Sequence, residues 1–165
     1  MEFYNITNDY ISYIQKYDPK VAYNKNAQRP YIGIVLKIDN INYYAPFTSP
    51  KPKHRLMKNS LDFRKIGNGL YGAINFNNMI PVPDTALLRI DIKSIENIHY
   101  KRLLQNQYLA IQMDETAIIK TAKNLRELII RENSSLSTYQ LKVKNRCCNL
   151  ILLEKISQQY EQNNI

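Results

Sequence analysis

The hydrophobic pattern changes its period halfway along the chain, and this change constrains the fold more than any other feature. In the first half, short runs of branched and aromatic residues alternate with turn residues, as at 31–38 (YIGIVLKI) and 41–47 (INYYAPF). In the second half, apolar residues recur every three or four positions, which predicts helices over 98–113 and 114–132. Strands followed by helices in a short chain favour an α+β fold, with helices covering a small curled sheet.

Shorter patterns predict the remaining elements. Asp39-Asn40 is typical of a two-residue hairpin turn between the first two runs. We also expect strands at 3–6, 61–66, 71–76 and 87–90, an extended segment at 79–83, a helix at 8–16 capped by Asn8, a polar link after 133 and a C-terminal helix at 149–160. No repeat or linker interrupts this order, so residues 1–165 are predicted to form a single domain.

The charge of the chain indicates a polyanionic partner. Lys and Arg number 23 against 14 Asp and Glu, giving a formal net charge of +9. Nucleic acid fits this charge better than an acidic membrane surface does. The apolar runs are far shorter than the ~20 residues of a membrane span, and the first ten residues lack the pattern of a secretory signal. Adjacent Cys147 and Cys148 bridge only with strain, so we expect reduced thiols in a cytoplasmic protein.

The composition predicts neither a metal nor a small-molecule cofactor. The chain has two histidines, no Cys-x-x-Cys and no spaced cluster of carboxylates, so it lacks an obvious ligand set. It also lacks the glycine-rich motifs that bind nucleotides. Thirteen tyrosines are present, and their rings either stack on bases or pack half-buried in a core.

The segment 43–58 (YYAPFTSPKPKHRLMK) carries the chemistry most suited to phosphate. An aromatic strand ends in Thr48 and Ser49 and enters a proline-stiffened turn that is rich in cations and free of carboxylates. RNA brings its own nucleophile, the 2′-hydroxyl, so an enzyme needs only to orient it and to stabilise charge on the phosphate oxygens. The same residues also form ordinary solvated turns. A non-catalytic nucleic-acid-binding module and an adaptor for acidic proteins therefore remain open at this point.

Several separated blocks in this chain resemble the ToxN/AbiQ endoribonuclease toxins of type III toxin–antitoxin systems, which also act in phage defence. The blocks are FYNIT at 3–7, RPYIGIVL at 29–36, YYAPFTSPKPKH at 43–54, GAINFNNMIPVP at 72–83, YKRLLQNQ at 100–107 and CCNLILLE at 147–154. The resemblance implies a compact, strongly curved antiparallel sheet, similar to the SH3-like barrel of the Kid/MazF toxins and elaborated with helices.

The resemblance also implies an activity and its partners. Members of this family cleave mRNA and their own repetitive antitoxin RNA without a metal, in a sequence-selective way that leaves 2′,3′-cyclic phosphate ends. Each repeat of the antitoxin RNA folds as a pseudoknot, which inhibits the toxin in a closed protein–RNA assembly. The expected biological roles are phage defence and plasmid maintenance.

Site residues carry over by position. The catalytic set falls on Thr48, Ser49 and Lys51: the hydroxyls position the scissile phosphate, and Lys51 stabilises charge and is a candidate to protonate the leaving group. The predicted RNA-binding residues are Tyr23, Lys25, Arg29, Lys53, His54, Arg55, Lys101 and Arg102. His54 is also a candidate general acid or base, because an unperturbed histidine pKa of ~6.5 suits that work.

Two further groups of residues stay open. The family uses a tyrosine on the long helix, but this chain has Gln105 there, with Tyr100 and Tyr108 on either side as candidates for the site or for the core. The second half also carries cations that either follow the phosphates of an RNA or are solvated surface residues. They are Lys120, Lys123, Arg126, Arg131, Lys142, Lys144 and Arg146.

Overall fold

A hairpin of two long strands forms the centre of the computed structural model, which describes residues 1–163. Strands β2 (Tyr31–Ile38) and β3 (Ile41–Thr48) pair antiparallel, and Asp39 in the turn between them has a φ of 51°. Most residues of both strands are buried, which explains why neither sequence alternates cleanly between apolar and polar residues. The predicted hairpin is confirmed.

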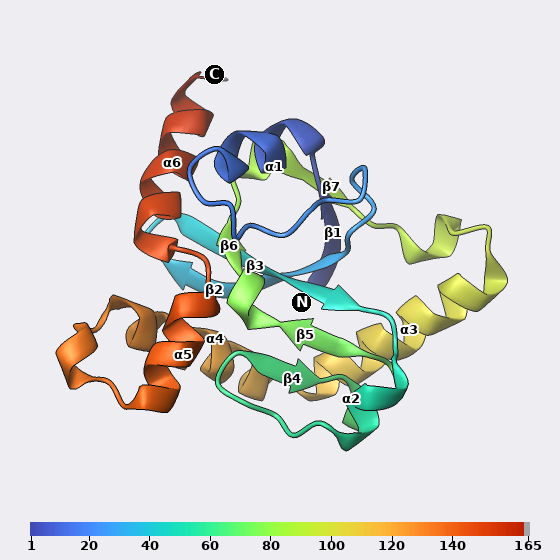
Figure 1. The fold of residues 1–165 in the computed structure, drawn as a ribbon. Coiled ribbons are helices and arrows are strands. Elements are labelled where there is room, and N and C mark those ends of the chain that lie inside the picture. The colour runs from blue at the N-terminus through green and yellow to red at the C-terminus, as the bar shows by residue number, and fades with distance from the viewer. Residues whose placement is uncertain (164–165) are drawn as a thin grey trace.

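The other strands extend this hairpin into a seven-stranded sheet in which every pairing is antiparallel (Figure 1). They are β1 (Glu2–Ile6), β4 (Phe63–Lys65), β5 (Ala73–Asn75), β6 (Ile80–Pro81) and β7 (Leu87–Arg89). The strand order is β4-β5-β3-β2-β1-β7, and β6 pairs with the first half of β3. The sheet is therefore open, with β4 and β7 at its edges. The predicted antiparallel sheet is confirmed, while its likeness to an SH3-like barrel stays a prediction.

The described residues form six α-helices, and the longest of them lie in the second half of the chain, as expected. They are α1 (Asn8–Gln15), α2 (Pro52–Leu56), α3 (Ile98–Met113), α4 (Glu115–Ile130), α5 (Thr138–Arg146) and α6 (Leu150–Asn163). Figure 1 shows α1 and α6 side by side, and the ring centroids of Tyr10 and Tyr160 lie 5.0 Å apart between them. The fold is thus a mixed α and β structure with an open sheet and a helical C-terminal half.

Two local predictions were wrong. Thr7 rather than Asn8 occupies the N-cap position of α1, and the Asn8 side chain instead accepts a hydrogen bond from Asn24. The expected polar link after residue 133 contains α5. The side chains of Ser137 and Gln140 each accept a hydrogen bond from the other residue's backbone N–H, which forms a capping box. Local capping starts this helix, and only one of its side chains is buried, so its hydrophobic pattern was too weak to read.

One buried cluster joins the sheet to the helices. Phe3 of β1 packs against Phe47 of β3 with ring centroids 4.7 Å apart, and the Tyr10 hydroxyl donates to the carbonyl of Pro81 at 2.6 Å. Cys147 and Cys148 are both free and buried, and burial raises the pKa of each thiol to about 12. They therefore behave as inert core residues.

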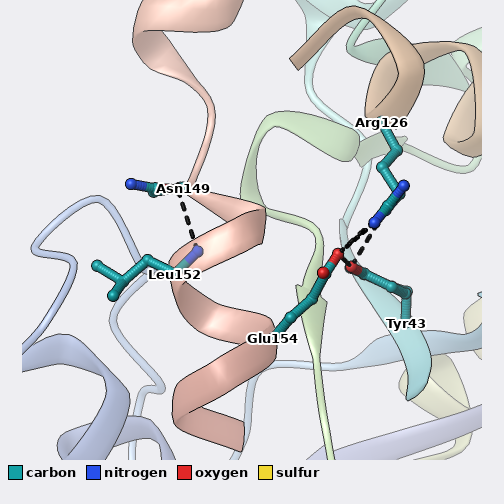
Figure 2. Close-up of polar contacts among 5 residues, drawn as sticks. All are labelled: Tyr43, Arg126, Asn149, Leu152 and Glu154. Atoms are coloured by element: carbon teal, nitrogen blue, oxygen red, sulfur yellow. Dashed lines mark hydrogen bonds and ion pairs between the residues drawn. The ribbon is translucent and has the colours of Figure 1, made fainter. Parts of the chain in front are cut away.

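A polar network within this core ties two helices to the central strand (Figure 2). The Arg126 guanidinium of α4 donates two hydrogen bonds to Glu154 Oε1 of α6, at 2.8 and 3.0 Å, and the Tyr43 hydroxyl of β3 contacts the same oxygen. At the start of α6, Asn149 Oδ1 accepts a hydrogen bond from the backbone N–H of Leu152. The network fixes α4 and α6 against the strand that leads into the 48–51 segment.

None of the helices in the described part of the chain combines the length and apolar character that crossing a membrane requires.

Candidate active site

A cleft of about 870 Å³ opens where β3 ends. Five parts of the chain form it: strand β1, the loop before β2, the end of β3 with the turn that follows it, the segment between β7 and α3, and α3 itself. None of its lining residues is an Asp or a Glu, so its cations face no neutralising carboxylate. Such a surface is suited to an anionic ligand.

Five of the predicted site residues meet in this cleft, namely Thr48, Ser49, Lys51, Lys25 and Arg29. The first three come from the end of β3 and the turn after it, and the other two from the loop that precedes β2. Amide side chains that sequence reasoning missed complete the wall. They are Asn5, Gln28, Asn97 and Gln107. No local motif marks these amides, because they come together only through the fold.

The end of β3 is held in place by close backbone packing. Thr48 pairs with Ala73 of β5, and the side chain of Gln107, which is buried, donates to the carbonyls of Tyr71 at 2.7 Å and of Thr48 at 3.3 Å. Gly72 has a φ of +108°, and a Cβ there would lie 1.8 Å from the Thr48 carbonyl oxygen. A glycine is therefore required for the strand end to approach this closely.

The hydroxyls of the predicted catalytic pair differ in environment. Ser49 is exposed, whereas the Thr48 Oγ1 atom is buried and has no hydrogen-bond partner within residues 1–163. A buried hydroxyl without a partner costs about 1–3 kcal/mol. Such a group at the wall of a cleft is suited to donate a hydrogen bond to a ligand.

Lys51 is fixed through its backbone by the short helix that follows. The Lys51 N–H donates to His54 Nδ1 at 3.2 Å, and the Lys51 carbonyl accepts from the His54 N–H at 2.9 Å. His54 is only 3% exposed. Burial lowers the pKa of the imidazole, and the positive charges of Lys51 and Lys53 lower it further. His54 thus lies behind Lys51 and does not line the cleft, contrary to the position expected of a phosphate-binding residue.

The loop before β2 reaches the cleft through a turn of unusual backbone conformation. Lys25, Asn26 and Ala27 have φ values of 51°, 55° and 57°, a left-handed conformation that costs about 1–2 kcal/mol for each non-glycine residue. Asn24 holds the turn: its carbonyl accepts from the N–H groups of residues 28 and 29, and its Nδ2 donates to the Ile6 carbonyl at 2.8 Å. Strain of this kind persists only where the surroundings impose it, and it often occurs at functional sites.

The structure separates the two candidate tyrosines of the long helix. Tyr100 lines the cleft, where burial raises its pKa, and its N–H is capped by Asn97 Oδ1 at 2.9 Å. Tyr108 packs edge-on against Phe3, and its hydroxyl donates to Glu2 at 3.3 Å. Tyr100 therefore lines the cleft, and Tyr108 packs against the core.

The remaining predicted RNA-binding residues lie outside the cleft. They are Tyr23, Lys53, His54, Arg55, Lys101 and Arg102. The side chain of Tyr23 is exposed, and its carbonyl accepts from Arg29 Nε at 2.6 Å. The Lys101 ammonium donates to the carbonyl of Lys93. Arg55 lines a second, smaller cavity beside α2.

Most arginines of the second half are engaged by other protein groups. Arg126 is paired with Glu154, and Arg146 makes two hydrogen bonds to the buried Asp62 at 2.6 and 2.7 Å. Arg131 donates to the Ser135 carbonyl. Arg126 and Arg146 are thus paired with carboxylates, unlike the cations of the cleft.

Across the described residues, no group of three or more His, Cys, Asp or Glu side chains lies together in a way that could hold a metal ion.

Comparison with known proteins places this chain in a family. A family model described as "Toxin ToxN, type III toxin-antitoxin system" matches residues 2–158. Endoribonuclease ToxN of Bacillus thuringiensis subsp. kurstaki is 31% identical over 166 residues, which cover 98% of this chain and 84% of that protein. Endoribonuclease ToxN of Pectobacterium atrosepticum is 35% identical over 141 residues, covering 79% of this chain and 82% of that protein.

Solved structures agree with the sequence comparisons. One, determined in work on selective toxin inhibition by a non-coding RNA pseudoknot in bacterial type III toxin–antitoxin systems, has a TM-score of 0.85 at 30% identity and covers 97% of both chains. AbiQ, a lactococcal anti-phage endoribonuclease of the type III toxin–antitoxin system, has a TM-score of 0.79 at 27% identity and covers 98% of both chains. The chain therefore belongs to the ToxN/AbiQ family of endoribonuclease toxins of type III toxin–antitoxin systems.

Proposed function

We propose that this chain is a metal-independent, sequence-selective endoribonuclease that cuts mRNA in the cleft at the end of β3. One observation carries the proposal: in a chain of this family, Thr48, Ser49, Lys51, Lys25 and Arg29 meet in a single cavity without a carboxylate. A scissile phosphodiester needs hydroxyl donors and fixed cations, and this cavity offers both.

The proposed reaction uses the RNA's own 2′-hydroxyl as the nucleophile. Its oxygen attacks the adjacent phosphorus as its proton passes to water, the bond from phosphorus to the 5′-oxygen breaks, and the products are a 2′,3′-cyclic phosphate and a 5′-hydroxyl. Thr48 and Ser49 donate hydrogen bonds that orient the phosphate in line for attack. Lys51 stabilises the charge that builds up on the phosphate oxygens and supplies a proton to the departing 5′-oxygen. The Thr48 hydroxyl is buried and has no partner among residues 1–163, which supports its role in orienting the phosphate.

Other cations of the site bind the strand beside the scissile phosphate. We assign this role to Lys25 and Arg29 in the cleft, and Tyr100 offers a ring on which a base stacks. Tyr23, Lys53, Arg55, Lys101 and Arg102 stay predicted contacts for RNA that extends beyond the cleft. We assign His54 to positioning Lys51 through the backbone, because its imidazole is buried.

We further propose that a repetitive antitoxin RNA controls this activity in the cytoplasm. The toxin would cut that RNA into units and then be inhibited by each unit, folded as a pseudoknot, in a closed protein–RNA assembly. Support comes from the family match and from the similar structure obtained in work on toxin inhibition by an RNA pseudoknot. The expected role is phage defence.

The decisive experiment measures RNA cleavage in the presence of EDTA by the parent and by Lys51→Ala, Ser49→Ala and Thr48→Val. Loss of one group that stabilises transition-state charge costs about 10²–10³ in rate, so we expect that loss for Lys51→Ala with an unchanged free energy of unfolding. An RNA with a single 2′-deoxy substitution at the cut site should resist the parent enzyme. Lys58→Ala is the matched control, because Lys58 is also an exposed cation of this segment but lines neither cavity.

Full activity of the Lys51 and Ser49 variants would refute the catalytic assignment and favour a non-catalytic RNA-binding module. Loss of activity with EDTA would refute metal independence alone. Growth arrest by the parent in cells, relieved by co-expression of a tandem-repeat RNA encoded beside the gene, tests the proposed regulation separately.

A further inference from the structure

A second cavity adjoins the cleft at Lys51. It has a volume of about 530 Å³ and is lined by Pro50, Lys51, Pro52, Arg55, Leu56 and Gly69. Pro50 and Lys51 also line the main cleft, so the two cavities share one wall. A volume of this size falls within the range of sites that take a small ligand, about 300–1,000 Å³.

The wall between the cavities is rigid. Prolines stand on both sides of Lys51, and each fixes the φ of its own residue. Helix α2 packs directly on the 67–69 turn, since a Cβ at Gly69 would lie 2.5 Å from the His54 carbonyl oxygen. The reciprocal hydrogen bonds between Lys51 and His54 then fix the wall to the helix. The second cavity is therefore a formed feature of the protein surface.

The lining of this cavity combines an exposed apolar surface with an unpaired cation. Leu56 is 88% exposed and the neighbouring Met57 and Leu70 are also exposed, although burial of such side chains is favourable. The Arg55 side chain has no hydrogen bond or ion pair with any residue of the described range. A nucleotide presents the complementary chemistry, because its base has an apolar face and its phosphate is an anion.

We propose that this cavity binds one nucleotide that flanks the scissile phosphate on the same RNA strand. The proposal rests on the proposed function, because the strand is located by the phosphate at Thr48, Ser49 and Lys51. The RNA would pass over the wall at Lys51, with one neighbour in the cleft and the other in the second cavity. Its base would lie against Leu56 and the Pro52 ring, and the Arg55 guanidinium would contact the base or its phosphate. Arg55 and Leu56 would then contribute to sequence selectivity.

The test compares an RNA that the parent cuts at one mapped position with copies that lack a single base on the 5′ or the 3′ side of the cut. For the parent, we expect loss of one of these two bases to lower kcat/KM about tenfold, as stacking contacts of this kind do. Leu56→Ser and Arg55→Ala should lower kcat/KM on the intact RNA by a similar factor. Removing that same base should then cause these variants little further loss.

Two matched controls separate this subsite from general effects. Lys58→Ala removes an exposed cation just beyond α2, and Met113→Ser removes an apolar side chain that is 91% exposed at the end of α3. When the base is missing, both control variants should lose as much kcat/KM as the parent does. The subsite is refuted if the Leu56 and Arg55 variants also keep that penalty, or if neither flanking base matters to the parent. Lys51→Ala distinguishes the two proposals. If it slows cleavage of every substrate by about 10²–10³ while the Leu56 and Arg55 variants keep the parental penalty, the catalytic site is correct and only the subsite is wrong.

Discussion

Two regions of this molecule both carry cations but use them differently. In the cleft at the end of β3, Lys25, Arg29 and Lys51 converge with no carboxylate among the lining residues. In the region where α4, α5 and α6 meet the sheet, Arg126 and Arg146 point at acidic partners and complete ion pairs with them. The same residue types therefore lack carboxylate partners in one region and hold the fold together in the other.

The comparison teaches that net charge overstates the surface available to RNA. A cation already bonded to a carboxylate releases few counterions when a phosphate approaches, so it adds little to affinity. A cation without a carboxylate partner keeps the positive electrostatic potential that attracts an anionic ligand. The difference between the regions lies in the partners of the cations.

The largest effect is expected where a paired cation is removed. The side chains of Arg126 and Glu154 are each 15% exposed, so Arg126→Leu leaves a largely buried carboxylate without its partner. Breaking such a pair costs about 3–5 kcal/mol of unfolding free energy, measurable by urea denaturation. The double variant Arg126→Leu/Glu154→Gln removes the charge but keeps an acceptor for the Tyr43 hydroxyl, and it should recover most of the loss. If Arg126→Leu instead kept its stability and lost RNA affinity, Arg126 would belong with the cleft cations.

The next effect concerns the backbone that positions the cleft hydroxyls. Gly72→Ala places a Cβ where φ is +108° and the Thr48 carbonyl oxygen is 1.8 Å away. We expect a loss of about 2 kcal/mol in unfolding free energy, together with a marked drop in cleavage rate as Thr48 is displaced. Gly67→Ala is the control, because φ there is +54° and the new Cβ would meet only the Tyr71 ring. It should cost some stability but leave cleavage near the parental rate.

The sequence predicted the sheet and the long helices because their signals are local. The hairpin at 31–48 is set by two branched runs and its turn, and α3 and α4 by helical periodicity. Helix α5 was missed because only Val143 is buried along it. Short capping signals such as Ser137 with Gln140 are weak when no apolar stripe follows them.

The site was predictable where its residues are contiguous and unpredictable where the fold brings them together. Thr48, Ser49 and Lys51 lie in one short motif, and the structure collects them in one cleft. The buried Gln107 reaches that cleft from a helix 59 residues away in sequence, and no local pattern marks it. Nor could sequence show that His54 faces inward, because burial depends on Gly69 packing beneath α2.

A smaller effect separates the two kinds of cation in binding. For RNA that is not cleaved, Lys25→Ala should reduce the slope of log affinity against log salt by about one, because one phosphate contact is lost. Arg146→Ala should leave the slope unchanged, because its guanidinium is already bonded to Asp62. Titrations between low and moderate salt measure both slopes. If both variants reduced the slope equally, Arg146 would contact RNA even though it is paired with Asp62.

The smallest effect is expected at His54, a buried residue, and concerns how the free energy of unfolding depends on pH. Burial and the unpaired charges of Lys51 and Lys53 lower its pKa, so the folded protein binds a proton less readily than the unfolded chain does. Above an unfolded pKa of ~6.5 both states are neutral, and this site does not make stability depend on pH. As the pH falls below that value, the unfolded chain is protonated first, and the free energy of unfolding must decrease until the folded pKa is passed.

His54→Gln tests this assignment, because the glutamine amide keeps an acceptor for the Lys51 N–H but does not titrate. Urea denaturation at pH 7.5 and pH 5.5 should show a smaller loss of stability on acidification for the glutamine variant than for the parent. Cleavage at neutral pH should survive in His54→Gln and fall in His54→Ala, which removes the acceptor. Parallel stability curves for parent and glutamine variant would show that His54 titrates normally, and that the cations beside it are screened from the interior after all.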